Sequence, residues 1–310
     1  MRTVTLPVPR AALAALLALS AACGQTTNKV LLIGIDGVRP DVLAEVPTPN
    51  IDRLIEAGAF STRGNTTRPT ISGPAWSSML IGVWPDKHGV WSNDFAGNRY
   101  SEYPDFLTRL ERIRPQVETF VAADWLPLVT DDSGGPLFTA EIDRIVVHDG
   151  YTAGWAEADE LGVRAAAAAL RDADPDAVFV YLGNPDEMSH QAWSIGRRYR
   201  EAIALSDAHV GQLVDAVTGR SSYADEDWLI LISTDHGRLA TGQHGGEAPE
   251  ETTIFVLAHG PSVLPGTIAG TPQIVDVAVT ALAHMGVKID AAWGLDGRPV
   301  ALRRTRRRGR

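Results

Sequence analysis

A short apolar segment near the N-terminus decides the fold: it reads VLLIGIDG over residues 30–37. An uncharged run of this length is typical of a strand that is buried on both faces of a parallel sheet. The run ends in Asp36 and Gly37, which together form a polar turn signal. Three further runs of the same kind follow along the chain: Ala177–Leu182, Trp228–Ser233 and Thr253–Ala258.

Helical patterns lie between these predicted strands, at Asn50–Ala57, Trp76–Ile81, Trp155–Arg171 and Tyr199–Val217. Strands that alternate with helices predict an α/β sheet with helices on both faces. About 280 residues are enough for one large core, and we find no repeat and no low-complexity linker. We therefore expect a single domain over residues 24–302.

The two ends of the chain differ from this body. Two arginines precede an apolar run at residues 11–22, which predicts a signal peptide over residues 1–23 and export of the protein. The sequence LSAAC that ends at Cys23 resembles a bacterial lipobox, so we expect lipidation of this cysteine, with ordinary secretory cleavage as the alternative. Residues 303–310 contain six arginines and predict a basic, disordered tail.

The charge of the body excludes one class of partner. The formal net charge is −10, but the eight basic residues of the two ends leave 20 basic against 38 acidic residues, or −18, in residues 24–302. Because Lys and Arg supply most nucleic-acid affinity by neutralising phosphates, no nucleic-acid interface is expected. The single cysteine, Cys23, excludes an internal disulfide and a cysteine-rich zinc site. The only membrane contact that the sequence predicts is the lipid anchor, and the oligomeric state stays open.

Acidic residues follow three of the predicted strands. Asp36 ends the first run, Asp186 follows the second and Asp235 follows the third. In open α/β sheets, ligands bind at the edge where the carboxyl ends of the strands meet. We therefore expect these three carboxylates to gather at one site.

Histidines accompany two of these acids. His190 lies four residues after Asp186, so the two side chains share one face of a helical turn. His236 is adjacent to Asp235, and His244 follows in the glycine-rich loop GQHGG. Carboxylates and imidazoles without thiolates suit zinc, and other divalent metals less strongly. The set is large enough for two ions, which clamp phosphoryl transfer when they lie about 3.5–4 Å apart.

Ser72, in the segment RPTISGPAW over residues 68–76, is the candidate nucleophile. Pro74 suits the first position of a helix, which places Ser72 just before a helix N-terminus, where an anionic substrate is favoured. A bound metal ion there lowers the pKa of the serine hydroxyl. Use of Ser72 as a helix cap is the structural alternative, and Thr70 is the alternative nucleophile.

In order along the chain, these segments resemble the motifs of the alkaline phosphatase superfamily, nearest to its type I phosphodiesterase/nucleotide pyrophosphatase branch. The matching segments are GIDG at 34–37, SGP at 72–74, GVWPDKHG at 82–89, PDEMSH at 185–190 and STDHG at 233–237. The resemblance implies an alkaline phosphatase-like three-layer sandwich, with a mostly parallel central sheet and helices on both faces. It also implies an exported metal-dependent hydrolase of small phosphate esters, above all of phosphodiester or nucleotide pyrophosphate bonds.

Two zinc ions and a phosphorylated Ser72 intermediate follow from the same resemblance. Carried over by motif, the ligands of one zinc ion are Asp36, Ser72, Asp235 and His236. The ligands of the other are Asp186, His190 and His244, with His259 and His284 as alternatives to His244.

The resemblance also favours Ser72 over Thr70, because Pro74 and Gly82 follow Ser72 at the family's spacing. In the family's pattern, an asparagine three residues after the nucleophile contacts a phosphate oxygen. Here that position is Ala75, whose side chain cannot donate a hydrogen bond. We therefore expect Asn93, or backbone amides around Ser72 and Gly73, to bind the substrate.

Two other functions stay open. Hydrolysis of sulfate esters or phosphonates is the first, since SGP overlays the sulfatase modification motif, although Trp76 stands where that motif requires arginine. An exported binding protein without catalytic activity is the second. Such a protein predicts a damaged ligand position, whereas all seven predicted ligands are present.

Overall fold

The computed structural model describes residues 26–303. The predicted signal peptide with Cys23 and the predicted tail beyond Arg303 lie outside the described residues. Within them, one eight-stranded sheet runs in the order β4-β3-β5-β1-β6-β7-β2-β8. The strands are β1 Thr27–Ile35, β2 Ala59–Asn65, β3 Thr119–Ala123, β4 Arg144–Val147, β5 Ala177–Leu182, β6 Glu226–Ser233, β7 Thr253–His259 and β8 Gly266–Thr267.

The sheet is mostly parallel. In the described part of the chain, β7 alone runs against its neighbours, pairing antiparallel with both β6 and β2. The central strand β1 pairs in parallel with β5 on one side and β6 on the other. All four strands predicted from the sequence are present.

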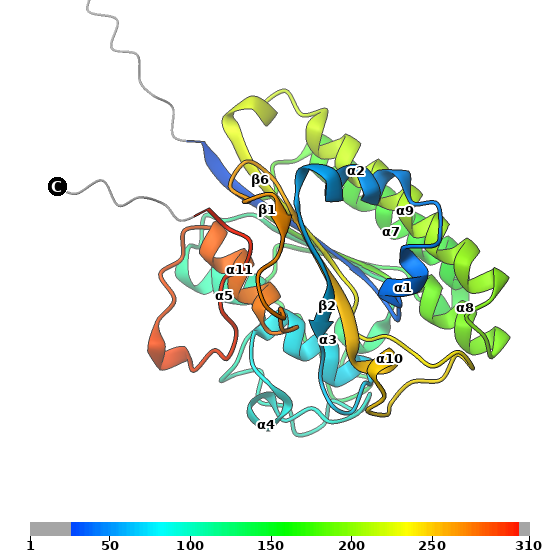
Figure 1. Cartoon of the computed structure of the whole chain (residues 1–310). Helices are drawn as coiled ribbons and strands as arrows, with labels where there is room; N and C mark the ends of the chain where they lie inside the picture. Colours follow the sequence, from blue (N-terminus) through cyan, green and yellow to red (C-terminus); the bar gives the residue numbers. More distant parts are fainter. Residues whose placement is uncertain (1–25, 304–310) are drawn as a thin grey trace, which may run out of the picture.

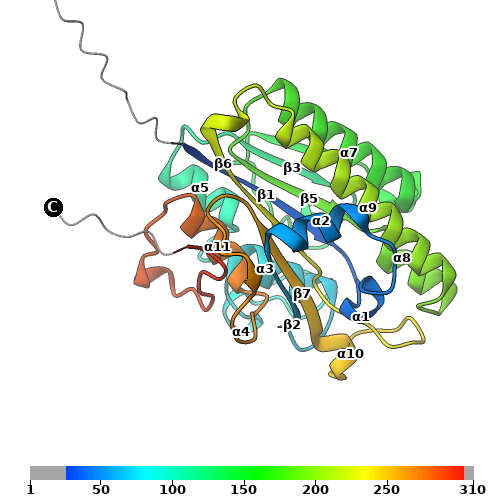
Figure 2. The same ribbon diagram turned by 45° about the horizontal axis from the view of Figure 1, so that its top comes forward.

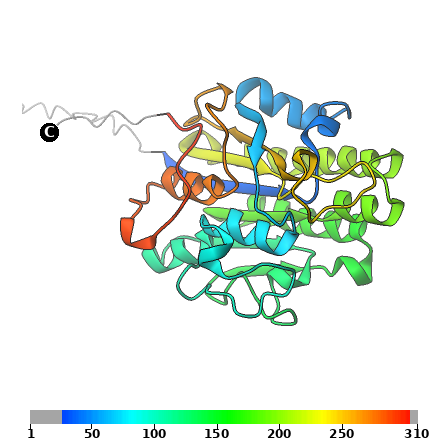
Figure 3. The same cartoon turned by 60° about the horizontal axis from the view of Figure 1, so that its bottom comes forward.

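Helices cover both faces of the sheet and make the predicted three-layer sandwich (Figure 1). One face carries α1 Pro40–Leu43, α2 Pro49–Ala57, α7 Trp155–Asp172 and α9 Arg197–Thr218, with α8 Asn184–Ala192 beyond the end of α9. The long helices α7 and α9 lie side by side in both views (Figure 2). The other face carries α3 Ser72–Ile81, α5 Phe106–Ile113 and α11 Asp276–His284 (Figure 3), and short helices lie at α4 Pro85–His88, α6 Gly150–Ala153 and α10 Pro249–Thr252.

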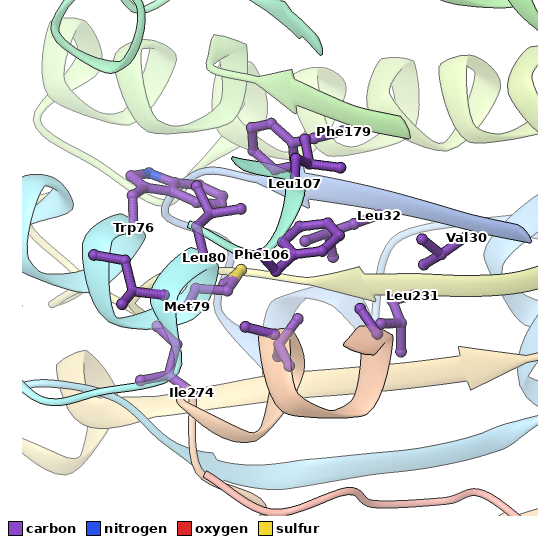
Figure 4. Close-up of a cluster of buried hydrophobic side chains, with 14 of the residues drawn as sticks. Val30, Leu32, Trp76, Met79, Leu80, Phe106, Leu107, Phe179, Leu231 and Ile274 are labelled. Atoms are coloured by element: carbon purple, nitrogen blue, oxygen red, sulfur yellow. The ribbon is translucent and has the colours of Figure 1, made fainter. Parts of the chain in front are cut away.

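The strand β1 supplies both cores, because alternate side chains of a strand point to opposite faces. Val30 and Leu32 belong to the core under α3, α5 and α11, whereas Leu31 and Ile33 belong to the core under α2, α7 and α9. Figure 4 shows the first of these cores, in which Leu32 lies among the side chains of α3 and α5. Gly34 leaves room for the Trp76 ring, since a β carbon there would lie 2.4 Å from it.

The register of the sheet brings three strand ends level. Ile35 of β1 pairs with Leu182 of β5, and Gly34 of β1 pairs with Ser233 of β6. The residues that follow β1, β5 and β6 therefore emerge at one edge of the sheet, as the sequence predicted. Within residues 26–303, none of the helices combines the length and apolar character that a membrane span requires.

We predict that Leu32→Ala lowers the free energy of unfolding by about 2–5 kcal/mol, because it leaves a cavity beside the fully buried side chains of α3. Leu264→Ala is the matched control, since Leu264 is 61% exposed and a surface change costs within about 0.5 kcal/mol. Chemical denaturation measures both. Equal midpoints for the two variants would contradict this account of the core.

Candidate active site

Seven predicted site residues meet at the carboxyl edge of the sheet. Asp36 follows β1, and Asp235 and His236 follow β6. The helix α8 starts two residues after β5 and carries Asp186 and His190 one turn apart. The remaining two residues are Ser72, at the start of α3, and His244, in the loop between β6 and α10.

The first group of side chains surrounds the Nε2 atom of His236. This atom lies 3.3 Å from Asp235 Oδ2, 3.6 Å from Asp36 Oδ1 and 3.3 Å from Ser72 Oγ. The other ring nitrogen, Nδ1, donates to the carbonyl oxygen of Gly237 at 2.9 Å. Because Nδ1 carries the proton, Nε2 presents a lone pair to the carboxylates and the serine.

The second group consists of Asp186, His190 and His244. His190 Nε2 lies 3.2 Å from Asp186 Oδ2 and 2.9 Å from His244 Nε2. His244 Nδ1 donates to the carbonyl oxygen of Thr70 at 2.7 Å, so its Nε2 atom also presents a lone pair. The ring of His244 stacks on that of His236 with 3.8 Å between centroids, which brings the two groups side by side.

Two buried carboxylate oxygens in the site lack a hydrogen-bond donor among residues 26–303. Asp36 Oδ2 accepts from Trp76 Nε1 at 2.9 Å and from Tyr181 Oη at 2.6 Å, but Asp36 Oδ1 has no partner. Asp235 Oδ1 accepts from the Gly37 amide, but Asp235 Oδ2 has none. Leaving charged oxygens buried and unpaired is costly unless a cation binds them.

Burial favours the neutral form of three ionisable side chains in the site. It raises the pKa of the Asp235 carboxyl well above its usual range, with the neighbouring Asp36 charge adding to the shift. It also lowers the pKa of His236 and His244. Imidazoles that stay neutral are ready to bind a metal.

The two groups could each hold a divalent cation. Ligand atoms of Asp186, His190 and His244 all lie within 4.8 Å of one another, and so do those of Asp36, Asp186 and His236. Asp186 therefore lies within reach of both groups, whereas the sequence assigned it to one. Mixed carboxylate and imidazole ligands without sulfur fit zinc.

Ser72 faces this site, but it is not placed quite as predicted. The helix α3 begins at Ser72 itself, Ile71 is its N-cap residue, and no side chain caps it by a hydrogen bond. The predictions that Ser72 precedes the helix, and alternatively that it caps the helix, are therefore both wrong. Its hydroxyl instead lies beside His236, 7% of the residue being exposed.

Thr70 has a different environment from Ser72. Its hydroxyl donates to the Gly246 carbonyl oxygen at 2.9 Å and accepts from the Gly245 amide at 2.9 Å. Its own carbonyl oxygen accepts from His244. Thr70 thus fixes the loop that carries His244, and its hydroxyl is occupied.

Asn93 lies at the mouth of the site. Its Oδ1 atom accepts from the Gly73 amide at 2.8 Å, which orients the side-chain amide. The Gly73 amide is therefore already bonded to Asn93, so the Asn93 side chain stays the predicted donor to the substrate. Asn93, Ser72, Asp186 and His244 line one small cavity of about 110 Å³, together with Asp36, Trp125, Tyr151, Trp155, Tyr181, Gly183, Glu187 and His190.

The other candidate histidines lie elsewhere. His284 bonds to the carbonyl oxygens of Lys29 and Asp227 near the start of β1, at the opposite end of the sheet. His259 ends the reversed strand β7 and so lies at that opposite edge as well. His244 is therefore the histidine that reaches the second group.

Sequence reasoning missed Arg238, which is fully buried and joins three segments of the site. Its guanidinium bonds to the Asp186 carboxylate, to the Gly37 carbonyl oxygen at 2.9 Å and to the Gly242 carbonyl oxygen at 3.1 Å. Gly37, at φ +65°, has no room for a β carbon beside this guanidinium. The sequence offered one signal for this role of Arg238, namely a basic residue two positions after His236 in an acidic chain.

Comparison with known proteins matches the chain to one family. The family model described as type I phosphodiesterase / nucleotide pyrophosphatase matches residues 30–246. Mouse ectonucleotide pyrophosphatase/phosphodiesterase family member 7 is 21% identical over 236 residues, which are 73% of this chain and 53% of that protein. The chain thus spans about half the length of this curated relative.

Solved structures share the fold. Murine ectonucleotide pyrophosphatase/phosphodiesterase 5, in complex with AMP, has a TM-score of 0.65 at 14% identity and covers 84% of this chain and 96% of its own. The phosphonate monoester hydrolase of Agrobacterium radiobacter has a TM-score of 0.66 at 16% identity, over 87% of this chain and 76% of its own.

We predict that Arg238→Gln destabilises the metal-free protein by about 3–5 kcal/mol, because it removes one partner of a buried ion pair. It should also weaken zinc binding by about 10- to 100-fold, the usual effect of losing a group that orients a ligand. Denaturation and competition with a chelating dye measure the two quantities. Arg197→Gln is the control, since Arg197 is 79% exposed in its ion pair; identical behaviour of the two variants would refute the assignment.

Proposed function

The chain belongs to the type I phosphodiesterase/nucleotide pyrophosphatase family, and on this premise we propose that it hydrolyses small phosphate esters, above all phosphodiester or nucleotide pyrophosphate bonds. One observation carries the proposal. Ser72 Oγ lies 3.3 Å from the unprotonated ring nitrogen of His236, at a site where two buried carboxylate oxygens find no hydrogen-bond donor in the described part of the chain. A neighbour of known structure that binds AMP supports a substrate of this size and charge.

The proposal includes two zinc ions, with other divalent metals as substitutes. Asp36, Ser72, Asp235 and His236 would hold one ion, and Asp186, His190 and His244 would hold the other. When bound, these ions supply the positive charge that favours a serine alkoxide over the hydroxyl and offsets the charge of the phosphate.

The chain's own residues carry out two displacements. Ser72 Oγ attacks phosphorus, the Oγ–P bond forms, and the bond from phosphorus to the leaving alcohol breaks. The hydroxyl proton passes to solvent, and the departing alkoxide takes a proton from water. Water then attacks the phosphoserine, the Oγ–P bond breaks, and the Ser72 hydroxyl is restored with release of the phosphoryl product.

Asn93 would stabilise the charge that develops on a phosphate oxygen. The side-chain oxygen Oδ1 of Asn93 accepts a hydrogen bond from the amide of Gly73, the residue after the nucleophile. The side-chain NH₂ group is therefore free to donate into the cavity. A donor that is fixed before the reaction needs no reorganisation in the transition state. Asn93 is therefore assigned to substrate binding.

Hydrolysis of sulfate esters or phosphonates is the second candidate, because a phosphonate monoester hydrolase shares the fold. The sulfatase modification motif requires arginine at position 76. Trp76 instead lies fully buried, and its indole nitrogen donates to Asp36. Because position 76 holds tryptophan and not arginine, the sulfatase modification is not expected here. Phosphate esters are therefore the favoured substrates. A binding protein without activity is disfavoured, since all seven proposed ligands converge on one edge of the sheet.

Export is part of the proposal, because residues 1–23 carry the pattern of a signal peptide with a lipobox at Cys23. The protein would then act in the periplasm, outside the cell, or anchored by lipid to the outer face of a membrane. Intact-mass measurement of the protein purified from its native host tests this directly. A chain that keeps residues 1–22 and carries no lipid would contradict it.

We predict that Ser72→Ala lowers turnover of bis-nitrophenyl phosphate by at least about 10³-fold, as expected when a nucleophile is removed. Acid quenching of the wild-type reaction should trap phosphate on the peptide that contains Ser72, as read by mass spectrometry. Thr70→Ala is the matched control and should keep the phosphorylated peptide. Phosphate on Thr70, or undiminished turnover in Ser72→Ala, would overturn the nucleophile, and a preference for nitrophenyl sulfate over every phosphate ester would overturn the substrate class.

We predict that the purified protein binds about two zinc ions per chain. Removal by a chelator should abolish hydrolysis, and added zinc should restore it. His244→Ala should lower the metal content to about one ion, because it removes one of the three ligands of the second group. Atomic emission spectroscopy counts the ions. A chain that stays free of metal after reconstitution would favour the binding protein over the enzyme.

A further inference from the structure

The two ends of the described chain lie close together, at the sheet edge opposite the candidate active site. Thr27 begins β1, and Asn28 pairs with Asp227 at the start of β6. Asp227 accepts a hydrogen bond from the Ser262 hydroxyl, and the Ser262 carbonyl oxygen accepts from the Arg303 amide at 2.8 Å. Figures 1 and 2 show both ends on the side away from α8 and α10.

The length of β1 separates this edge from the candidate active site. The strand has nine residues and rises about 3.3 Å per residue, so Asp36 lies about 30 Å from Thr27. Salt at 0.1 M screens exposed charges over about 10 Å, a third of that distance. The acids of the candidate active site therefore add little repulsion at the opposite edge.

A basic segment leaves the domain at this edge. Residues 303–310 contain six arginines and no acid. Clusters of four to eight basic residues beside a membrane attachment point are typical of binding to anionic lipid headgroups. The predicted attachment point, Cys23, precedes the first described residue by three positions, which span about 10 Å at full extension. The predicted lipid and the basic segment are therefore attached to the same edge of the domain.

An exposed leucine lies beside the basic segment. Leu264 is 61% exposed, and its amide donates to the Ala301 carbonyl oxygen at 2.8 Å, two residues before Arg303. A large apolar side chain gains free energy when it leaves water for the boundary between headgroups and acyl chains. Leu264 and the basic segment thus offer apolar surface and positive charge side by side.

Three acids at this edge are paired with basic side chains. Lys29 Nζ lies 2.8 Å from Asp174 Oδ1 and 2.8 Å from Asp176 Oδ1. Arg220 Nη2 lies 2.8 Å from Glu226 Oε1 and also contacts Asp174. These pairs reduce the repulsion that an acidic domain would otherwise meet at an anionic surface.

We propose that this edge docks on an anionic phospholipid bilayer through residues 303–310 and Leu264, beside the lipid at Cys23. The candidate active site then faces away from the bilayer and receives substrate from the surrounding solution. Stable attachment commonly takes two signals, and an acyl group with a basic patch is one such pair. The inference concerns the orientation of the domain and is independent of the proposed hydrolysis.

Hydrogen–deuterium exchange on vesicles tests the contact, because it reads where the bilayer touches the protein whether or not a lipid anchors it. Protein purified after export from its native host is bound to phosphatidylcholine vesicles, with or without about one third phosphatidylglycerol. We expect exchange at residues 260–266 to slow on the anionic vesicles alone, and exchange at residues 239–247, beside the candidate active site, to stay unchanged. Salt at 1 M should remove the protection, because the screening length falls to about 3 Å.

Two sets of substitutions separate charge from structure. Replacing the six arginines of residues 303–310 with glutamine should abolish the protection at residues 260–266. Replacing the same six with lysine is the matched control and should keep it, since attraction to anionic lipid depends on positive charge. Equal protection on both kinds of vesicle, protection at both edges of the sheet, or protection that survives the glutamine changes would overturn the proposal.

The alternative partners of the basic segment give different results. If the segment binds the acidic domain of its own chain, residues 260–266 or another surface of the domain are protected without vesicles, and anionic lipid adds nothing. If the segment binds nucleic acid, a duplex oligonucleotide displaces the protection on anionic vesicles. Either result would overturn the membrane assignment and leave the proposed hydrolysis untouched.

A chain without lipid allows a direct measurement of affinity. If intact mass shows secretory cleavage in place of lipidation, sedimentation with vesicles measures the contribution of the basic segment alone. Six arginines should favour the anionic vesicles over phosphatidylcholine by at least about 100-fold, and the glutamine changes should remove this preference. Equal affinity for the two kinds of vesicle would refute the docking edge.

Discussion

The rest of the site depends on two carboxylates that the sheet buries without full hydrogen bonding. Asp36 and Asp235 emerge from β1 and β6, which pair in parallel as far as Gly34 and Ser233. Tyr181, Trp76 and the Gly37 amide occupy one oxygen of each carboxylate and leave the other bare. Burying these carboxylates in the charged form is costly unless a cation binds them. The fold therefore places the proposed metal ligands where Ser72 lies.

The proposed metal site reconciles an acidic protein with an anionic substrate. A formal charge of −18 in residues 24–302 opposes binding of an extended polyanion. Three of those charges, on Asp36, Asp186 and Asp235, lie within the proposed metal site and would be neutralised there. The surrounding surface stays acidic. The proposed site is thus suited to a small phosphate ester rather than to an extended polyanion.

Sequence reasoning found the strands and ligands whose signals are local. Runs such as residues 30–35 are apolar throughout because both of their faces are covered, and the acids after them mark the strand ends. The strands β2 and β4 were missed because part of each is exposed and their patterns are mixed, and β3 was missed because it is only five residues long. The antiparallel direction of β7 could not be predicted either, because an apolar run has the same pattern in a parallel and an antiparallel strand.

The contacts that hold the site were beyond prediction because their partners lie far apart in sequence. Thr70 fixes His244 across 174 positions, and Arg238 reaches Asp186 across 52. Both contacts use residue types that are common in loops, so composition gives no sign of them.

The conformation of residues 70–73 explains why the hydroxyls of Thr70 and Ser72 have different roles. The Thr70 side chain bonds to the loop at Gly245 and Gly246, and its carbonyl oxygen fixes the tautomer of His244. Two residues later the chain enters α3, and Ser72 turns toward His236 instead. The residue that orients a metal ligand and the proposed nucleophile are thus fixed to one short stretch of backbone. A shift of this stretch would move both at once, so the distance between Ser72 and His244 depends on the backbone of residues 70–72 and on the hydrogen bond from His244 to Thr70.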